Sequence, residues 1–197
     1  LSIAPNDVVR VAQIPFLPIA FFKQHEVRIP GKVEQLFTSS GTTGMEPSKH
    51  WLHDVSVYQE SYRTAFNLFY GDISQYTLLA LLPSYAEREG SSLIYMVDDL
   101  LQQAQEGSGY YLHNQQELFE KLENLKKLGK PTILLGVTYA LLDFIEQFPI
   151  QFPELIVMET GGMKGKRKEL IREELHQALC TGFGVDNIHS EYGMTEL

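Results

Sequence analysis

The segment whose residue types point most directly to chemistry is Thr38–Lys49, with the sequence TSSGTTGMEPSK. Its glycines allow a tight turn whose backbone N–H groups point inward and bind phosphate oxygens, and its Ser and Thr hydroxyls add donors. Lys49 follows at a distance from which an ammonium group neutralises phosphate charge. A polar surface turn would have the same composition. A Walker A loop is excluded, because that motif places Lys directly after its second Gly, whereas Lys49 comes five residues after Gly44 and precedes His50.

Two later segments combine glycine with polar residues directly after predicted strands. They are Glu159–Gly162 (ETGG) and Tyr192–Glu196 (YGMTE). Because the carboxyl ends of parallel strands meet at the edge where such sheets bind ligands, we expect both segments and the Thr38–Lys49 loop to share one site. Considered singly, Tyr192 would be a packed aromatic residue and Glu196 a surface acid. Their joint placement after a strand favours a binding site.

These motifs resemble those of a known family. Ser39–Gly44 is similar to the phosphate-binding signature of the adenylate-forming (acyl-activating) enzymes, and Tyr192–Glu196 is similar to the Tyr-Gly-x-Thr-Glu signature of that superfamily. Both motifs together, in the family's order, are more specific than either alone. Within the superfamily the chain resembles the acyl-protein synthetase (LuxE-like) branch. The segments that carry this resemblance are Ile14–Lys23, Leu81–Leu93, Met158–Leu170 and Ser190–Leu197.

The resemblance implies a ligase that activates a carboxylic acid, expected to be a fatty acid, as its acyl-adenylate with ATP and Mg²⁺. The acyl group would then pass to a thiol acceptor, which would be an acyl-carrying protein, a reductase subunit or coenzyme A. This chemistry needs a cradle for phosphates, a divalent cation and an aromatic face for adenine.

The same resemblance assigns a role to each motif residue. Hydroxyl side chains of the first motif would hold the β- and γ-phosphates, and the later glycines would let the backbone pass close to adenine and to the acyl carboxylate. Tyr192 would stack on adenine. Thr195 would bind the α-phosphate and Glu196 would ligate Mg²⁺, so these two are the expected catalytic residues. The expected nucleotide-binding residues are Ser39, Ser40, Gly41, Thr42, Thr43, Gly44, Lys49, Gly161, Gly162, Tyr192 and Gly193.

The chain also departs from the family pattern. Additional residues around Pro47 place Lys49 later than in the family signature, and Tyr85 stands where many relatives have His. The ribose-binding Asp, the hinge and the mobile C-terminal domain with its catalytic Lys would all follow Leu197. We therefore expect residues 1–197 to form a single α/β nucleotide-binding domain, the N-terminal part of a longer enzyme.

Alternation of short apolar runs with longer segments of helical periodicity predicts an α/β fold with a mostly parallel sheet flanked by helices. Helical connections between the strands imply right-handed crossovers. We expect strands at Leu36–Ser39, Tyr76–Leu82, Thr132–Leu135, Leu155–Glu159 and Asn187–Tyr192. We expect helices at Asp54–Tyr70, Ser91–Gln105, Asn114–Leu128, Tyr139–Gln147 and Lys166–Leu179, the last broken by Gly182 and Gly184.

Composition excludes several classes of protein. The net charge of −9, from 25 acidic and 16 basic residues, argues against nucleic-acid binding. Apolar runs are far shorter than the roughly 18 residues of a membrane span. The single Cys180 excludes an internal disulfide and fits the reducing cytoplasm, where we expect the protein. His50 and His53 lack the further ligands of a zinc site.

Two features have alternative interpretations. The basic cluster of Lys164, Lys166, Arg167 and Lys168 is either a solvated face or a docking patch for an anionic partner such as pyrophosphate, a coenzyme A or carrier phosphate, or a partner subunit. Cys180 is either an acyl acceptor or a buried structural thiol. The second is favoured, because Cys180 lies on the apolar side of a predicted helix.

Two other functions are compatible with the motifs. One is a non-catalytic module that binds ATP or AMP and regulates a partner, and the other is a phosphotransferase that uses the Ser39–Lys49 loop. Pyrophosphate release that depends on added carboxylate separates acid activation from both. A binding module would show affinity without turnover, and a phosphotransferase would release ADP.

Replacing Thr42 and Thr43 together by Val tests the phosphate loop. The change keeps side-chain volume but removes two hydroxyl donors, so adenylation by the complete enzyme should lose about 2–4 kcal/mol of transition-state stabilisation. The thermal midpoint should barely move, because surface substitutions away from special features cost little. Rates come from pyrophosphate release and midpoints from scanning calorimetry. Matching losses of activity and stability would favour a purely structural turn.

Overall fold

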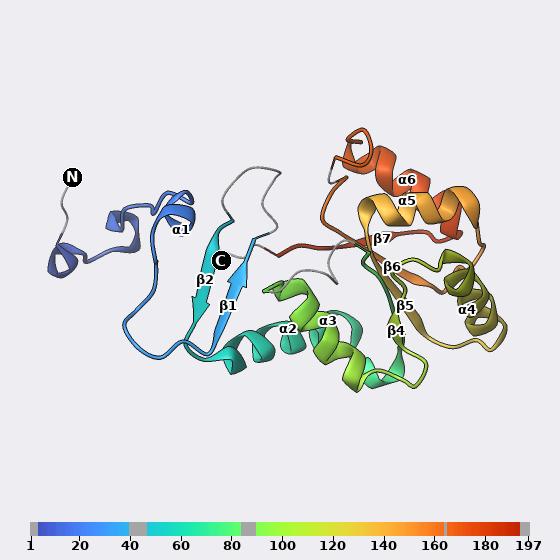
Figure 1. The fold of residues 1–197 in the computed structure, drawn as a ribbon, viewed down its shortest axis with the longest axis horizontal. Helices are drawn as coiled ribbons and strands as arrows, with labels where there is room; N and C mark the ends of the chain where they lie inside the picture. Colours follow the sequence, from blue (N-terminus) through green and yellow to red (C-terminus); the bar gives the residue numbers. More distant parts are fainter. Residues whose placement is uncertain (1–3, 40–46, 84–89, 164, 194–197) are drawn as a thin grey trace.

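A computed structural model describes residues 4–39, 47–83, 90–163 and 165–193. Its centre is a five-stranded parallel sheet, which confirms the expected α/β fold (Figure 1). In spatial order the strands are β4 (Gly109–Tyr110), β3 (Thr77–Leu81), β5 (Thr132–Val137), β6 (Ile156–Thr160) and β7 (Ile188–Glu191). Every residue of β3 and β5 is buried, as continuous apolar runs predict for strands covered on both faces.

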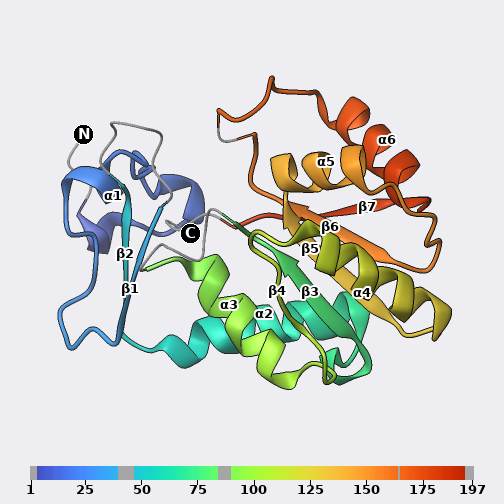
Figure 2. The same ribbon diagram turned by 45° about the vertical axis from the view of Figure 1, so that its right-hand side comes forward.

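Helices cover both faces of the sheet (Figures 1 and 2). One face carries α2 (Val55–Tyr70) and α3 (Ser92–Gln103), and the other carries α4 (Gln115–Lys127), α5 (Thr138–Gln147) and α6 (Arg172–Phe183). The helix after β3 lies on one face of the sheet and the helix after β5 lies on the other. The strand order therefore reverses between β3 and β5, which are neighbours in the sheet. In the described part of the chain, no helix has the length and apolar character that crossing a membrane requires.

A separate antiparallel pair precedes the sheet. It consists of β1 (Gln35–Thr38) and β2 (Lys49–Leu52). The sequence predicts the first strand but not the second, and its prediction that the first belongs to the parallel sheet is wrong, because β1 pairs with β2 in a sheet of its own. The N-terminal segment lies beyond this pair in Figure 1. It contains α1 (Phe21–Gln24) and the 3-10 turns Pro5–Asp7 and Val11–Gln13, and a further such turn, Ile73–Gln75, leads into β3.

Three helices begin directly after a side chain that caps their first turn. Asp54 accepts a hydrogen bond from the Ser56 N–H (2.9 Å) at the start of α2, and Asn114 accepts one from the Glu117 N–H (3.1 Å) at the start of α4. Ser91 caps α3 in the same way. These side chains satisfy N–H groups that have no partner within the helix, so the boundaries follow from local sequence.

The last helix begins later than predicted. We expected a helix from Lys166, whereas α6 begins at Arg172. The Arg167 side chain donates hydrogen bonds to Asp143 (2.7 Å) and Glu146 (2.6 Å) on α5. This contact with another element holds the preceding segment against α5, and Lys166, Arg167 and Lys168 are therefore not part of a helix.

The sequence predicts that Gly182 breaks the last helix, but Gly182 lies inside α6. A Cβ at this position would come 2.6 Å from the Cβ of Ile145 on α5, so the glycine permits close packing of the two helices. The helix ends instead at Gly184, whose φ of 68° is the left-handed conformation typical of helix ends.

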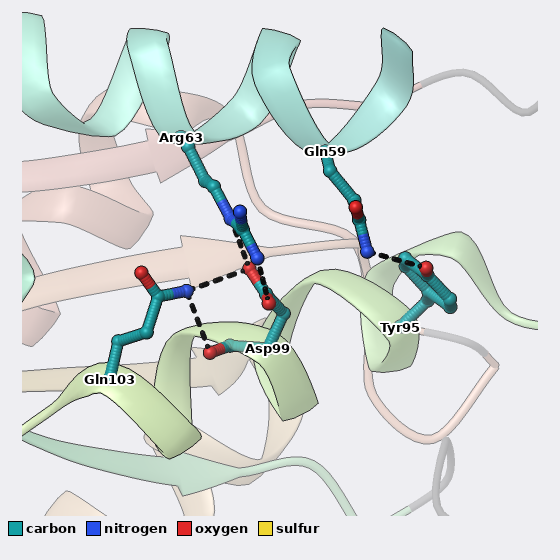
Figure 3. Close-up of polar contacts among 5 residues, drawn as sticks. All are labelled: Gln59, Arg63, Tyr95, Asp99 and Gln103. Carbon is teal, nitrogen blue, oxygen red and sulfur yellow. Dashed lines mark hydrogen bonds and ion pairs between the residues drawn. The ribbon is translucent and has the colours of Figure 1, made fainter. Parts of the chain in front are cut away.

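Polar side chains fasten α2 to α3 (Figure 3). Arg63 forms a two-pronged ion pair with Asp99 (Nε–Oδ2 2.8 Å), and Gln103 donates to the same carboxylate (2.9 Å). Toward the start of both helices, Gln59 donates to the Tyr95 hydroxyl (2.8 Å). The hydrogen bonds from Arg63 hold the pKa of Asp99 below its usual value. The two helices therefore form one wall against the sheet.

Gly184 and Gly129 give a matched test of helix ends, because both have positive φ, 68° and 60°. Ala is strained by about 1–2 kcal/mol at either position. At Gly184 its Cβ would also lie 2.8 Å from the Cα of Gln151, whereas nothing lies within 4 Å at Gly129. Gly184→Ala should thus lower the free energy of unfolding by about 1 kcal/mol more than Gly129→Ala. Urea unfolding measures both, and equal losses would show that the contact relaxes.

Candidate functional site

The loops that follow β6 and β7 lie side by side at one edge of the sheet. Thr160 pairs with Glu191 in the strand register, and the Thr160 hydroxyl donates to Glu191 Oε2 (2.5 Å). Gly161 follows with a φ of 69°, a conformation that favours glycine. A Cβ on Gly162 would meet nothing within 4 Å, so the backbone there is open to a ligand. The expected neighbours Gly161–Gly162 and Tyr192–Gly193 are thus brought together.

The base of the Thr38–Lys49 loop is closed by the antiparallel pair. Thr38 pairs with Lys49, the Ser39 N–H donates to the Ser48 carbonyl (2.9 Å), and the Ser48 N–H donates to Ser39 Oγ (2.8 Å). The Thr38 N–H donates to the carbonyl of Gly90 (2.9 Å), which fixes the pair to the segment before α3. The predicted phosphate ligands Ser40, Gly41, Thr42, Thr43 and Gly44 lie outside the described residues.

One cavity of about 570 Å³ is lined by the third motif segment and by residues next to the other two in sequence. Phe37 and His50 flank the first motif, Met158 precedes ETGG, and Tyr192 and Gly193 belong to the third. This volume is within the range of about 300–1,000 Å³ that is usual for small-molecule sites. The cavity lies between the α2–α3 wall and the sheet. Its other walls are largely apolar and include Tyr62, Phe66, Leu78, Leu100, Ile133 and Leu135.

Tyr192 is 81% exposed at the edge of this cavity. The interpretation of this residue as a packed aromatic side chain is therefore wrong, and its ring has a face free for a planar ligand. Thr195 and Glu196, the expected catalytic pair, lie outside the described residues. Within the described ranges, no three His, Cys, Asp or Glu side chains gather as a metal site would require.

Glu159 is a buried carboxylate to which the sequence analysis gave no role. It is 7% exposed and accepts hydrogen bonds from the hydroxyls of Thr138 (3.0 Å) and Ser190 (2.6 Å). His176 Nε2 on α6 lies 3.7 Å from Glu159 Oε1, beyond hydrogen-bonding distance. Glu159 therefore joins β6 to the end of β5 and to β7. The sequence indicated Glu159 only through its position, as an acidic residue that directly follows the apolar run Leu155–Met158.

Two ambiguous features of the sequence are clarified by their surroundings. Arg167 of the basic cluster is engaged by Asp143 and Glu146, so its charge is already paired within the chain. Cys180 is partly buried, and burial together with Asp186 raises the pKa of its thiol. A raised pKa disfavours the nucleophilic thiolate, which supports the structural role.

Comparison with known proteins finds no match from which a function could be assigned. No family model matches the chain, and no curated protein matches its sequence. The geometry of the described site is independent of the motif resemblance.

Removing the Glu159 carboxylate tests its structural role. Glu159→Ala removes the acceptor shared by the buried Thr138 hydroxyl and the exposed Ser190 hydroxyl, and should lower the free energy of unfolding by about 1–3 kcal/mol. Glu159→Gln keeps an acceptor and should cost less than half as much. Glu154→Ala, at an exposed position, is the control and should change stability by less than about 0.5 kcal/mol. Chemical unfolding gives all three values, and similar stability of all three variants would contradict the role.

Proposed function

We propose that this domain uses ATP to activate a carboxylic acid as its acyl-adenylate, for transfer to a thiol on a protein or on coenzyme A. The observation that carries the proposal is the cavity lined by Tyr192 of the third motif segment, by Phe37 just before the first and by Met158 just before the second. Three positions that are far apart in sequence, each within a motif segment or next to one, line one space large enough for a small molecule.

The described residues suit the two substrates in different ways. The exposed ring of Tyr192 and the open backbone at Gly162 suit a flat base and its sugar. The apolar walls between the α2–α3 pair and the sheet suit the hydrocarbon part of an acid, with a fatty acid as the expected class. The acid's carboxyl group would then lie at the Tyr192–Gly193 end of the cavity, close to the nucleotide.

In the proposed reaction, a carboxylate oxygen attacks the α-phosphorus of ATP. The bond between that phosphorus and the oxygen bridging to the β-phosphorus breaks, and pyrophosphate leaves. Glu196 would hold Mg²⁺, which supplies charge neutralisation on the phosphates. The acceptor thiol then takes the acyl group and releases AMP. The lone, partly buried Cys180 is consistent with a reducing cytoplasmic setting for this chemistry.

The test compares two variants in the complete enzyme. Tyr192→Ala should weaken AMP and ATP alike, by about 1–3 kcal/mol, because stacking on a base is lost. Glu196→Gln should leave AMP binding intact but raise the Mg²⁺ requirement and slow adenylation at least ~100-fold, about 2.7 kcal/mol on the barrier. Calorimetry with AMP and carboxylate-dependent pyrophosphate release measure these effects.

Each rival function gives a different result in the same assays. AMP binding without pyrophosphate release would indicate a regulatory binding module, and ADP production would indicate a phosphotransferase. A Glu196→Gln variant with an unchanged rate and Mg²⁺ titration would remove the metal-ligand assignment.

A further inference from the structure

Glu191 brings a carboxylate into a cavity whose other walls are largely apolar. It ends β7, lines the cavity beside Tyr192 and Gly193, and is half-buried. Its Oε2 accepts the hydrogen bond from Thr160 (2.5 Å). Burial raises the pKa of Glu191, because surroundings of low polarity disfavour the charged form.

The other carboxylate oxygen, Oε1, receives no hydrogen bond from residues 4–39, 47–83, 90–163 or 165–193, and no cation in these ranges pairs with Glu191. A Cβ on Gly193 would lie 3.2 Å from Oε1, so the missing side chain leaves space beside this atom. A partly buried carboxylate with one hydrogen bond is unfavourable unless another donor reaches it. The space at Gly193 admits that donor from a ligand.

We propose that Glu191 accepts a hydrogen bond from the ligand of this cavity, and thereby selects carboxylic acids that carry a hydroxyl or ammonium group near the carboxyl group. The inference rests on the proposed function, which puts the acid's carboxyl group at the Tyr192–Gly193 end. Glu191 adjoins that end, so its partner must sit on one of the first carbons of the acid. The rest of the acid follows the apolar walls at Leu78 and Ile133.

The experiment is isothermal titration calorimetry of the chain 1–197 with three acids of equal length: decanoate, 3-hydroxydecanoate and 2-aminodecanoate. The wild-type chain should bind at least one substituted acid about tenfold or more tightly than decanoate, because hydrogen bonds to a charged group are strong. The hydroxyl and ammonium arms show which donor the site prefers.

Three variants identify Glu191 as the source of the preference. Glu191→Leu removes the acceptor and should abolish the preference or reverse it toward decanoate. Glu191→Gln keeps an acceptor without charge, so a preference for the hydroxyl should persist while a preference for the ammonium falls. Gly193→Ala crowds Oε1 and should weaken the substituted acid more than decanoate. Glu60→Gln, at an exposed position of α2 outside the cavity, is the control and should bind like the wild type.

Equal affinity of the wild-type chain for all three acids, a preference that survives Glu191→Leu, or no binding of any acid would each overturn the inference. Should the Leu variant fail to fold, as judged by its thermal unfolding, the Gln and Gly193→Ala variants decide the outcome. Measuring AMP binding on the same samples distinguishes a failure of the Glu191 inference from a failure of the proposed function. AMP binding without acid selectivity overturns the role of Glu191 alone, whereas acid selectivity without AMP binding argues against adenylation.

Discussion

β6 and β7 are joined by two hydrogen bonds between side chains, one on each face of the sheet. The Thr160 hydroxyl of β6 donates to Glu191 of β7, and the Ser190 hydroxyl of β7 donates to Glu159 of β6. Because side chains alternate between faces, a shift of one residue would move each partner to the wrong face and break both bonds. The register that places the two glycine-containing loops side by side is therefore fixed from both faces, and the described site depends on it.

This arrangement matters because β7 is an edge strand, with β6 as its neighbour in the described sheet. The two carboxylates are nevertheless not equivalent. Glu159 is buried and accepts from two hydroxyls that come from different elements, whereas Glu191 is half-buried and has one donor among the residues that the structure describes. An acceptor that is already satisfied serves the fold. An acceptor whose second oxygen receives no hydrogen bond from the described part of the chain is available to a ligand at the edge of the cavity. This difference separates two residues of the same chemical type.

Much of the fold could be predicted because its determinants are local. Caps such as Asp54 and Asn114 define helix starts through neighbouring N–H groups, and apolar runs define the buried strands. The start of α6 could not be predicted, because Arg167 is held by Asp143 and Glu146 on α5, which lie 24 and 21 residues earlier in the chain. Likewise, strand ends predicted the position of Tyr192, but the contacts of Glu159 arise only from the register of separate strands.

The cavity itself follows from how α2 is supported. α3 buries Leu93, Val97 and Leu100, whereas α2 has one buried residue, Tyr62, and is fastened to α3 by polar side chains. Its apolar face is thus left partly uncovered, and Phe69 is 76% exposed where it lines the cavity. Apolar surface kept open beside polar groups is typical of ligand-binding grooves. The α2–α3 wall therefore costs the domain some apolar burial and leaves a space that a hydrocarbon ligand can fill.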